Sequence, residues 1–480
     1  MRSIRPIPAL AAVLAVAALL PAGAAAQTRN RFDTQLIAKI PAPGYPASAY
    51  PHPNGRVYVG TYVNPMGDTL PSRLFEFNPD NRALTRSWIV PGQDLAAEHG
   101  VQAATSDASG RIVLLDHTPA RALLLDPETG DFSTYATFAD LKPCTGAPDG
   151  NCSPTTQDLE PMANYAAWGT GGELYVTDFQ QGVIWRVPPG GGPARVWLAD
   201  RRLDGQMFGT TGIALAADRR TLIVAQGSSG GVVGALGTNP TAGKLYRLPI
   251  APDGSPGELT QFYESGPAEQ PDGFGIAESG RIYIALLTVN QIAVIAPDGH
   301  EVERFPTGTD GANGSPAPFD SPSSAKFLGS RLMVPNQSYF NGDRERQTLL
   351  DVETGERGLP EYIPPGAGGV DSVAADLTAL AVRPRRARAG RNAVVSLRLS
   401  EPARLTLRLE QRRGSRWKRL STLVRSGRSG ANTIKYGLRI RRGGRKRTVP
   451  AGRYRFVVSA VDTAGNKTAD VTGRAFRVVR

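Results

Sequence analysis

The feature that most constrains the fold of this 480-residue chain is a motif that recurs six times. Each copy has a few small or apolar residues, a turn that ends in a small residue, and then a run of β-branched and apolar residues. The copies span residues 48–60, 103–116, 165–178, 212–226, 273–286 and 324–336. Their spacing of roughly 50 to 60 residues is typical of a stacked or radial repeat architecture.

Each repeat holds several short strands and almost no helical periodicity, which favours an all-β chain with a six-bladed β-propeller, about one four-stranded blade per repeat. In repeat five we expect an inner strand from Arg281, a middle strand from Gln291 and an outer strand from Glu301. Repeat six lacks a clear outer strand, whereas an orphan strand at 32–41 precedes repeat one. We predict that this strand completes blade six, because a closed ring leaves no exposed sheet edge.

Residues 1–26 read as a secretory signal peptide, with Arg2 and Arg5 before an apolar core and small residues at the end. The apolar core is too short for a membrane span, so an uncleaved anchor is the less favoured alternative. We expect cleavage near Ala26, no transmembrane segment, and a protein that is secreted or associated with the cell envelope. Cys144 and Cys152 then predict one structural disulfide, and they do not suffice for a zinc site.

The net charge of +12 hides two regions of opposite sign. Residues 376–480 hold 28 Lys and Arg against 5 Asp and Glu, a net +23, while the rest of the chain carries a net −11. This split predicts two domains with different tasks. We place the signal peptide at 1–26, the propeller at 27–363, a Gly- and Pro-rich linker at 364–376 and a second domain at 377–480.

The second domain alternates apolar and polar residues with a period of two over short strands, which is typical of a β-sandwich. The expected strands are 377–383, 393–400, 403–412, 417–425, 454–462 and 474–479. Its closing pattern, residues 450–466, resembles immunoglobulin-like modules appended to exported bacterial proteins. That resemblance implies a sandwich with a spacer or attachment role.

Arginine runs in the second domain point to an anionic partner. In an exported protein we expect an anionic cell-envelope polymer, such as a wall polymer, phospholipid head groups or extracellular polysaccharide, rather than nucleic acid. The alternative is a solvated basic surface with no dedicated ligand.

The chain contains no phosphate-binding loop ending in Lys-Ser/Thr, no His-Glu-x-x-His and no Gly-x-Ser-x-Gly, so these classes of site are excluded. What remains is a ring of residues eight positions before each repeat turn, where strands enter at the channel mouth. The ring residues are Ala47, Gln102, Asn164, Thr211, Asp272, and Pro322 or Ser323. Convergent oxygen donors suit a hard cation such as calcium, which can polarise a carbonyl and activate water. Alternatively, these are ordinary turn residues that bond their own backbone.

Residues 271–273, 211–215 and 172–178 resemble the regucalcin and gluconolactonase family of six-bladed propellers, over most of residues 32–360. The resemblance implies a divalent cation, commonly calcium, at the channel mouth, and hydrolysis of lactones or phosphotriesters. It implies that Asp272 is both metal ligand and general base, and that Asn164 lies near the metal. The chain departs from the family at Ala47, where the family has Glu, and at Thr211, where it has Asn. These departures imply weaker metal binding.

The leading hypothesis is therefore a lactonase-type hydrolase of a small-molecule ligand at the channel. Asp272 would be catalytic, and Asp272, Asn164, Thr211 and Gln102 would hold Ca²⁺ or another divalent cation. The rival is a non-catalytic ligand-binding propeller attached to the envelope through the basic domain. A third alternative resembles strictosidine synthase, a metal-free propeller enzyme, with Glu98 or His99 in the channel. Tyr339, Phe340, Phe208 and Trp168 would line a ligand site or pack between blades.

Overall fold

The computed structural model describes residues 29–155, 157–205, 209–228, 242–368, 376–399, 403–428, 430–442, 445–462 and 467–480. Within these ranges the chain is almost entirely β-strand, and its one helix is a 3₁₀ turn at Arg201–Leu203. No helix of the described residues has the length and apolar character needed to cross a membrane. The predicted signal peptide lies outside the described residues, as do Phe208 and part of the predicted linker.

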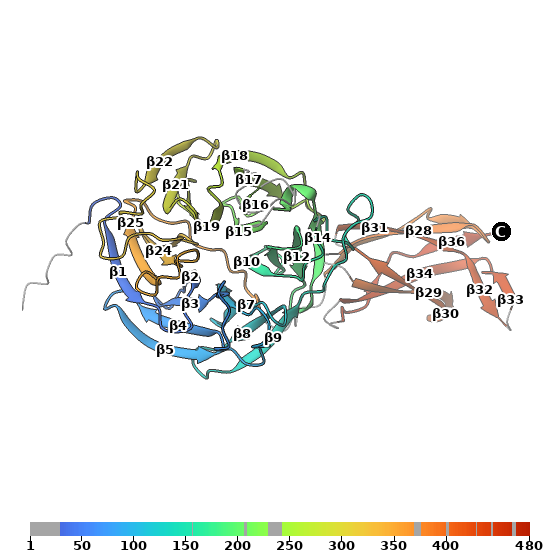
Figure 1. The fold of residues 1–480 in the computed structure, drawn as a ribbon. Coiled ribbons are helices and arrows are strands. Elements are labelled where there is room, and N and C mark those ends of the chain that lie inside the picture. Colours follow the sequence, from blue (N-terminus) through green and yellow to red (C-terminus); the bar gives the residue numbers. More distant parts are fainter. Residues whose placement is uncertain are drawn as a thin grey trace, which may run out of the picture.

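Six antiparallel sheets radiate around one axis and form a six-bladed propeller, which confirms the predicted fold class (Figure 1). Blade one comprises β2 (Pro46–Pro51), β3 (Val57–Thr61), β4 (Arg73–Asn78) and β5 (Ala83–Ile89). Blade two comprises β6 (Val101–Ser106), β7 (Ile112–Asp116), β8 (Arg121–Leu125) and β9 (Phe132–Thr137), and blade three β10 (Ala163–Trp168), β11 (Leu174–Asp178), β12 (Val183–Val187) and β14 (Arg195–Ala199). The short β13 (Gly192–Pro193) adds in parallel to the outer edge of blade two.

Blades four to six continue the same order. Blade four comprises β15 (Thr210–Leu215), β16 (Thr221–Gln226), β17 (Ala242–Pro249) and β18 (Thr260–Pro267), and blade five β19 (Pro271–Ile276), β20 (Ile282–Leu286), β21 (Gln291–Ile295) and β22 (Glu301–Phe305). Blade six comprises β23 (Lys326–Leu328), β24 (Arg331–Asn336), β25 (Thr348–Glu353) and β1 (Thr34–Lys39).

Ring closure by the first strand of the chain is confirmed. β1 pairs antiparallel with β25, with Thr34 opposite Val352 and Lys39 opposite Thr348. Just before the strand, the guanidinium of Arg29 donates to Oδ1 of Asp351 at 2.7 Å. The outer strand of the last blade therefore comes from the opposite end of the propeller sequence, which explains why repeat six lacks one of its own.

The innermost strand of each blade is one strand earlier than the sequence pattern suggests. In blade five the innermost strand is β19, and the apolar strand β20 that begins near Arg281 is second. Every residue of β7, β11 and β20 is buried, because second strands are covered on both faces by the neighbouring blades. They therefore have the strongest apolar signal, although β19 and its equivalents contact one another around the axis.

A second domain is a β-sandwich, as predicted, with its own apolar core (Figure 1). One sheet orders β26 (Leu377–Arg383), β28 (Asn392–Leu399) and β31 (Gly430–Gly437). The other orders β27 (Arg386–Arg388), β36 (Phe476–Val479), β34 (Gly452–Asp462), β29 (Ala403–Arg413) and β30 (Arg416–Gly427). β35 (Val471–Thr472) pairs with β34, and β32 (Arg439–Arg442) with β33 (Arg445–Thr448).

β31 corresponds to none of the predicted strands. Only Ile434 and Tyr436 of its interior are buried, and glycine stands at both ends, so its alternation is short and weak. Pairing with β28 over its whole length defines this strand, and the pairing is not visible in the local pattern.

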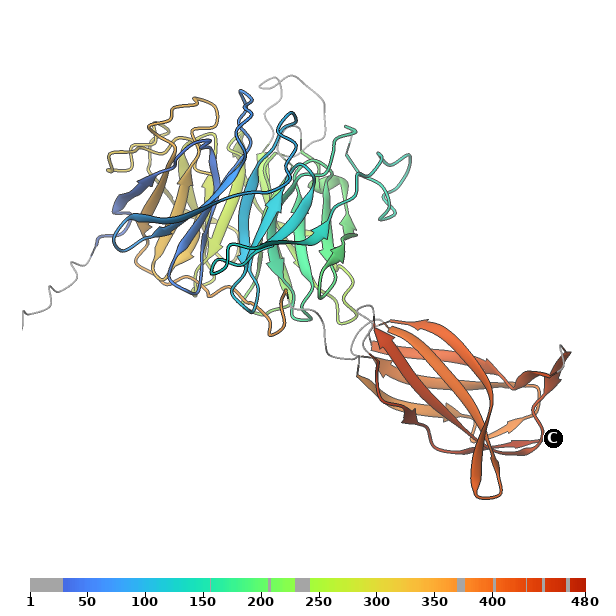
Figure 2. The ribbon, with the colours of Figure 1, turned by 90° about the horizontal axis from the view of Figure 1, so that it is seen from below.

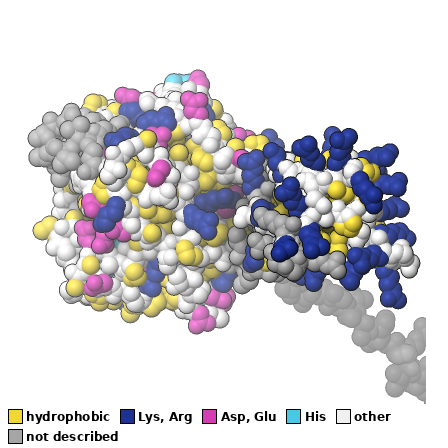
Figure 3. All heavy atoms as spheres, turned by 90° about the vertical axis from the view of Figure 1, so that its right-hand side faces the viewer, with side chains coloured by type: hydrophobic (Ala, Val, Ile, Leu, Met, Phe, Trp, Pro, Cys, Tyr) yellow, Lys and Arg dark blue, Asp and Glu magenta, His cyan; other side chains and the backbone are white. Residues whose placement is uncertain are grey.

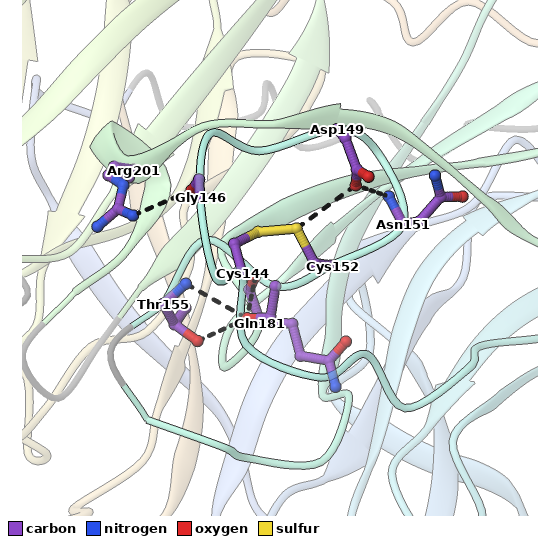
Figure 4. Close-up of a disulfide and its surroundings, with 9 residues drawn as sticks. Cys144, Gly146, Asp149, Asn151, Cys152, Thr155, Gln181 and Arg201 are labelled. Carbon is purple, nitrogen blue, oxygen red and sulfur yellow. Dashed lines mark hydrogen bonds between the residues drawn. A yellow bond between two sulfur atoms is a disulfide. The ribbon is translucent and has the colours of Figure 1, made fainter.

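The predicted disulfide between Cys144 and Cys152 is present (Figure 4). It closes the loop between β9 and β10, in which the backbone N–H of Asn151 donates to Oδ1 of Asp149 at 2.9 Å. Arg201 donates to the carbonyl of Gly146 at 3.4 Å and so connects this loop to the segment before β15. The bridge thus stabilises a loop that enters an innermost strand.

Candidate site at the proximal end of the propeller axis

The predicted ring residues lie at the end of the axis where the innermost strands begin, here called the proximal end. Gln102, Asn164, Thr211 and Asp272 are each the second residue of an innermost strand. Ala47 is the second residue of β2, and Ser323 shortly precedes β23. The sequence spacing therefore placed all six at the same level of the fold.

A β-bulge explains why the side chains at this level are set apart from the rest of each strand. In blade five, Pro271 pairs with Leu286 and the next pair is Phe274 with Ile284, so the innermost strand holds one extra residue. The same shift follows Pro46, Ala163 and Thr210 in blades one, three and four. Bulges leave a residue outside the ladder and redirect its side chain, and they are common beside active sites.

Hydrogen bonds connect the ring residues of neighbouring blades. Nε2 of Gln102 donates to Oδ1 of Asn164. Oγ1 of Thr211 donates to the carbonyl of Pro271 at 3.0 Å.

Ser323 closes the ring, since its hydroxyl donates to the carbonyl of Ala47 at 2.7 Å. Five of these six ring residues are buried, and Asp272 is partly exposed to solvent, so it is the ring residue that a ligand can reach.

Asp272 is a carboxyl in a desolvated setting beside a phenol. Its side chain retains some solvent contact, yet protein surrounds it so closely that desolvation raises its pKa well above the ordinary value. Hydrogen bonds from the Tyr165 hydroxyl and the Gly273 backbone oppose this rise without cancelling it. Because burial penalises the charged form, Asp272 holds its proton to a higher pH than an exposed carboxyl does.

Tyrosines from three blades surround this carboxyl. The Tyr165 hydroxyl has one proton, which it donates to the carbonyl of Ser323 at 2.8 Å across the axis and shares with the carboxyl of Asp272. Burial raises the pKa of Tyr62, and the nearby Tyr339, Asp272 and Glu98 raise it further. The Tyr62 hydroxyl lies 3.4 Å from Sδ of Met162. The proximal end thus combines the carboxyl of Asp272 with nearby tyrosines.

The remaining candidate residues, His99, Glu98, Trp168 and Phe340, lie in different environments. Both ring nitrogens of His99 lie 2.8 Å from backbone carbonyls, those of Ala97 and Leu70, so this ring joins two loops. Glu98 is exposed, and its charge adds to the desolvation that raises the pKa of Tyr62 and of Tyr339. Trp168 is a core residue whose indole N–H donates to Ser106, whereas Phe340 is half exposed and stacks edge-on against Tyr339.

The distal end of the axis is crossed by residues 354–368, here called the distal strap (Figure 1). The strap bonds to blade five, where Leu359 N–H donates to Ile276, and to blade two, where Ala108 N–H donates to Ala367. Figure 2 shows it on the side of the propeller opposite the disulfide loop. The first part of the predicted linker therefore packs against the propeller.

The strap brings Glu361 toward the axis. Glu361 is exposed, yet protein packed around its carboxyl desolvates it and raises its pKa, and the ammonium of Lys326 and the hydroxyls of Thr105 and Tyr50 partly offset the rise. Burial in turn lowers the pKa of Lys326, whose Nζ lies 5.9 Å from the centre of the Tyr165 ring. Tyr165 therefore contacts Asp272 on one side and faces a lysine on the other.

Sequence reasoning missed Tyr165, Tyr62, Lys326 and Glu361. Tyr165 and Lys326 both lie within the repeats, where a tyrosine or a lysine is an ordinary strand residue and gives no sign of function. One signal was available for Lys326, a charged residue at an innermost-strand position that is small or apolar in other repeats. Nothing in the sequence places Glu361 at the axis, because the strap reaches it through tertiary contacts only.

The donor set at the ring fits a weakly held divalent cation. Oε1 of Gln102 is buried and has no hydrogen-bond partner among the described residues, so an acceptor is available there. Asn164, Thr211 and Asp272 supply further oxygens, but only Asp272 carries charge. The described residues contain no cluster of three or more His, Cys, Asp or Glu side chains suited to a metal. Because calcium affinity rises with ligand charge, this set suits the millimolar range, about 10⁻⁴–10⁻³ M.

The fold and site define a six-bladed propeller with the partly exposed, desolvated carboxyl of Asp272 at the proximal end of its axis. No protein-family model matches the chain, and no curated protein matches it. Among solved structures it is similar to regucalcin, a calcium-binding protein from Agrobacterium tumefaciens, with 15% identity over 68% of this chain and 95% of that one and a TM-score of 0.46.

Two further solved structures are similar. A luciferin-regenerating enzyme shares 13% identity over 69% of this chain and 99% of its own, with a TM-score of 0.45. The PQQ-bound aldose sugar dehydrogenase of Streptomyces coelicolor shares 14% identity over 67% and 97%, with a TM-score of 0.43. Their names describe different activities, so function here must be argued from the site.

The contact between Gly273 and Tyr165 gives a test of the site. A Cβ at Gly273 would lie 2.5 Å from the Tyr165 hydroxyl and 2.7 Å from Oγ of Ser324. We expect Gly273→Ala to displace Tyr165 from Asp272, at a stability cost of about 1–3 kcal/mol for overpacking. Urea unfolding and the pH dependence of any activity would be measured together. An unchanged pH profile would show that Tyr165 does not influence Asp272.

Proposed function

We propose that the propeller is a lactonase-type hydrolase with its active site at the proximal end of the axis and Asp272 as general base. The observation that carries this proposal is the accessible but desolvated carboxyl of Asp272, next to the Tyr165 phenol. A general base is most effective when its pKa lies near the working pH, and desolvation moves a carboxyl in that direction.

The proposed reaction needs one base and one positioned water. Asp272 removes a proton from water as the water oxygen bonds to the lactone carbonyl carbon. The ring C–O bond then breaks, and Asp272 returns the proton to the leaving alkoxide, which yields a hydroxy acid. Tyr165 orients the carboxylate by its hydrogen bond, while Tyr62 and Tyr339 supply the walls against which an apolar part of the substrate packs.

A divalent cation, calcium by preference, belongs to the proposal as a weakly bound cofactor. Asp272, Asn164, Thr211 and Gln102 would hold it. When bound, such an ion polarises a carbonyl and lowers the pKa of water. The departure at Ala47 leaves no donor side chain in blade one, which accounts for the weak affinity expected.

Calcium should therefore stabilise the protein only at millimolar concentration. For a dissociation constant near 10⁻³ M, about 10 mM calcium adds about 1.4 kcal/mol by mass action. Thermal unfolding of chelator-treated protein would show a Tm increase of a few degrees, and Asp272→Ala would abolish it. No response at that concentration in the unsubstituted protein would remove calcium from the proposal.

The hydrolase itself is tested with a panel of lactones and phosphotriesters, followed by pH-stat titration of released acid. Turnover that is lost in Asp272→Asn supports the proposal. Absence of turnover of every substrate, with calcium present and absent, would contradict it.

The second candidate function is a non-catalytic ligand-binding propeller. It is favoured by the internal hydrogen bonds of the ring, since Gln102 bonds Asn164 and Thr211 bonds Pro271 rather than leaving their groups open. Under this function a bound ligand raises Tm in both the unsubstituted protein and Asp272→Asn, and no product forms.

Export to the cell envelope is part of the same proposal. A disulfide is stable in an oxidising compartment, which supports a location outside the cytosol. The sandwich would serve as an immunoglobulin-like attachment module for the propeller. N-terminal sequencing of the protein secreted by an expression host would test cleavage near Ala26.

A further inference from the structure

The sandwich is strongly basic, with far more Lys and Arg than Asp and Glu. Figure 3 shows Lys and Arg side chains distributed over the visible surface of this domain, with hardly any Asp or Glu among them. Arginine outnumbers lysine throughout the chain, so arginine content alone does not distinguish the sandwich. The positions of its arginines in the sheet register do.

Four exposed arginines form a row across the five-stranded sheet, here called the arginine row: Arg386, Arg477, Arg453 and Arg412. Arg386 of β27 stands opposite Arg477 of β36, which stands opposite Arg453 of β34. Gln411 pairs with Tyr454, and Arg412 and Arg453 are the next residues of the same two strands. Each of the four is next to at least one buried residue along its own strand. Because successive side chains of a strand point to opposite faces, the arginines project from the outer face of the sheet.

The row is electrostatically unfavourable by itself. Like charges directly opposite on adjacent strands destabilise a sheet. Among the described residues of the sandwich, the ion pairs are Arg408–Asp470 and Arg455–Glu410, so no member of the row has an ion-pair partner there. The four guanidiniums are exposed and are therefore open to an external anion, which would relieve this repulsion.

Trp417 of β30 ends the row. It stands opposite Arg412 and lies against two guanidiniums, that of Arg455 at 4.5 Å and that of Arg412 at 5.9 Å from the ring centre. Arg455 is fixed in turn by Glu410, with Nε 2.8 Å from Oε2. The indole thus holds the last guanidinium of the row in place.

We infer that the arginine row binds an acidic polysaccharide that carries one carboxylate on each sugar unit. Neighbouring strands are about 4.8 Å apart, so the row presents one guanidinium per strand at a spacing comparable to one sugar ring. Each guanidinium can take a carboxylate through two parallel hydrogen bonds. The polymer chain lies perpendicular to the strands, along the row.

Two features favour this partner over other polyanions. Single-stranded nucleic acid needs open aromatic faces for base stacking, whereas Arg455 already covers the ring of Trp417. Insertion into a bilayer needs exposed apolar side chains, and the one large exposed apolar residue in the described part of the sandwich is Val424. The inference concerns the sandwich alone and is independent of catalysis at Asp272.

The test uses the full exported chain and immobilised polygalacturonate, with fully methyl-esterified polygalacturonate as the uncharged probe. The row variant is Arg453→Gln with Arg477→Gln. The matched control is Arg398→Gln with Lys435→Gln, which removes the same charge from exposed positions of the other sheet. We expect the row variant to bind about tenfold more weakly or worse, and the control to remain within twofold.

Stability provides the second readout. Removing like charges that face each other should leave the Tm of the row variant equal to or above that of the unsubstituted protein, so lost binding cannot be attributed to unfolding. Equal losses in both variants would mean that net charge alone attracts the polymer, and would overturn the inference. Equal binding to the esterified polymer, or tighter binding to oligo-dT or to anionic phosphatidylglycerol vesicles, would overturn it as well.

Discussion

Replacing Asp272 by Asn is expected to lower the turnover of a lactone substrate by about 10²–10⁴-fold, the usual contribution of a general base. Asn keeps the size of the side chain and its hydrogen bond with Tyr165 but accepts no proton. The activity of the unsubstituted protein should fall as the pH drops through the raised pKa of Asp272, because protonation removes the base. The kcat/KM against pH would be measured for both proteins.

The same substitution should stabilise the protein near neutral pH. The folded pKa of Asp272 is raised above its unfolded value, so the carboxyl costs stability once the pH exceeds the unfolded value, and the whole cost is present above the folded pKa. Asp272→Asn removes that cost. Its Tm should therefore exceed that of the unsubstituted protein at pH 7 without calcium, and the difference should vanish below about pH 4.

A neighbouring carboxylate supplies the matched variant. Glu98→Gln removes an exposed negative charge from the same end of the axis, and its Tm should not show the pH-dependent gain. If Glu98→Gln abolishes turnover while Asp272→Asn retains it, the metal-free alternative resembling strictosidine synthase replaces the proposal. A lower Tm for Asp272→Asn at pH 7 would show that the carboxylate is stabilised where we infer desolvation.

Deleting residues 29–40 is expected to prevent the propeller from folding into a soluble monomer. The deletion removes β1, so β25 becomes an open edge with unpaired backbone groups. It also removes Ile37 and Ile40, both nearly fully buried, which together contribute about 3–6 kcal/mol. Phe32, stacked on Phe305 at 4.6 Å, is lost as well. The free energy of unfolding of a typical domain is only about 5–15 kcal/mol, so the lost burial energy is a large fraction of it.

The measurement is the soluble yield and Tm of the truncated chain, with a synthetic peptide of residues 29–41 added during refolding. The peptide should restore a soluble protein by pairing with β25. A control peptide in which Ile37 and Ile40 are replaced by Asp should not. A truncated chain that folds with its Tm unchanged would contradict the role of β1 in closing the ring.

The candidate site was only partly predictable from the sequence. Counting eight positions back from each turn found Gln102, Asn164, Thr211 and Asp272 at one level, since the innermost strands of blades two to five all have six residues. The count gave no sign that Gln102 and Asn164 bond to each other or that Asp272 faces Tyr165. These contacts join residues of different blades, 62 positions apart for Gln102 and Asn164 and 107 positions apart for Tyr165 and Asp272, and no local pattern encodes them.

The fold, in contrast, could largely be predicted from local sequence patterns. The closed propeller was predicted from six regularly spaced apolar segments and from the orphan strand before them. The sandwich was predicted from the alternating basic segment after them, because strand burial and repeat length are short-range properties. The second strands were mistaken for the innermost ones, since burial from both sides gives them the stronger apolar signal.

Sequence alone therefore determined the number of blades, the strand that closes the ring, the disulfide and the contrast in charge between the two domains. Only the tertiary structure decided which ring residue is accessible, why Asp272 is desolvated, and that the distal strap brings Glu361 toward Lys326. It also decided that arginines from four strands form one row. The physical reason is the same in each case: pKa and charge repulsion depend on distances between side chains, and folding sets these distances between segments far apart in the chain.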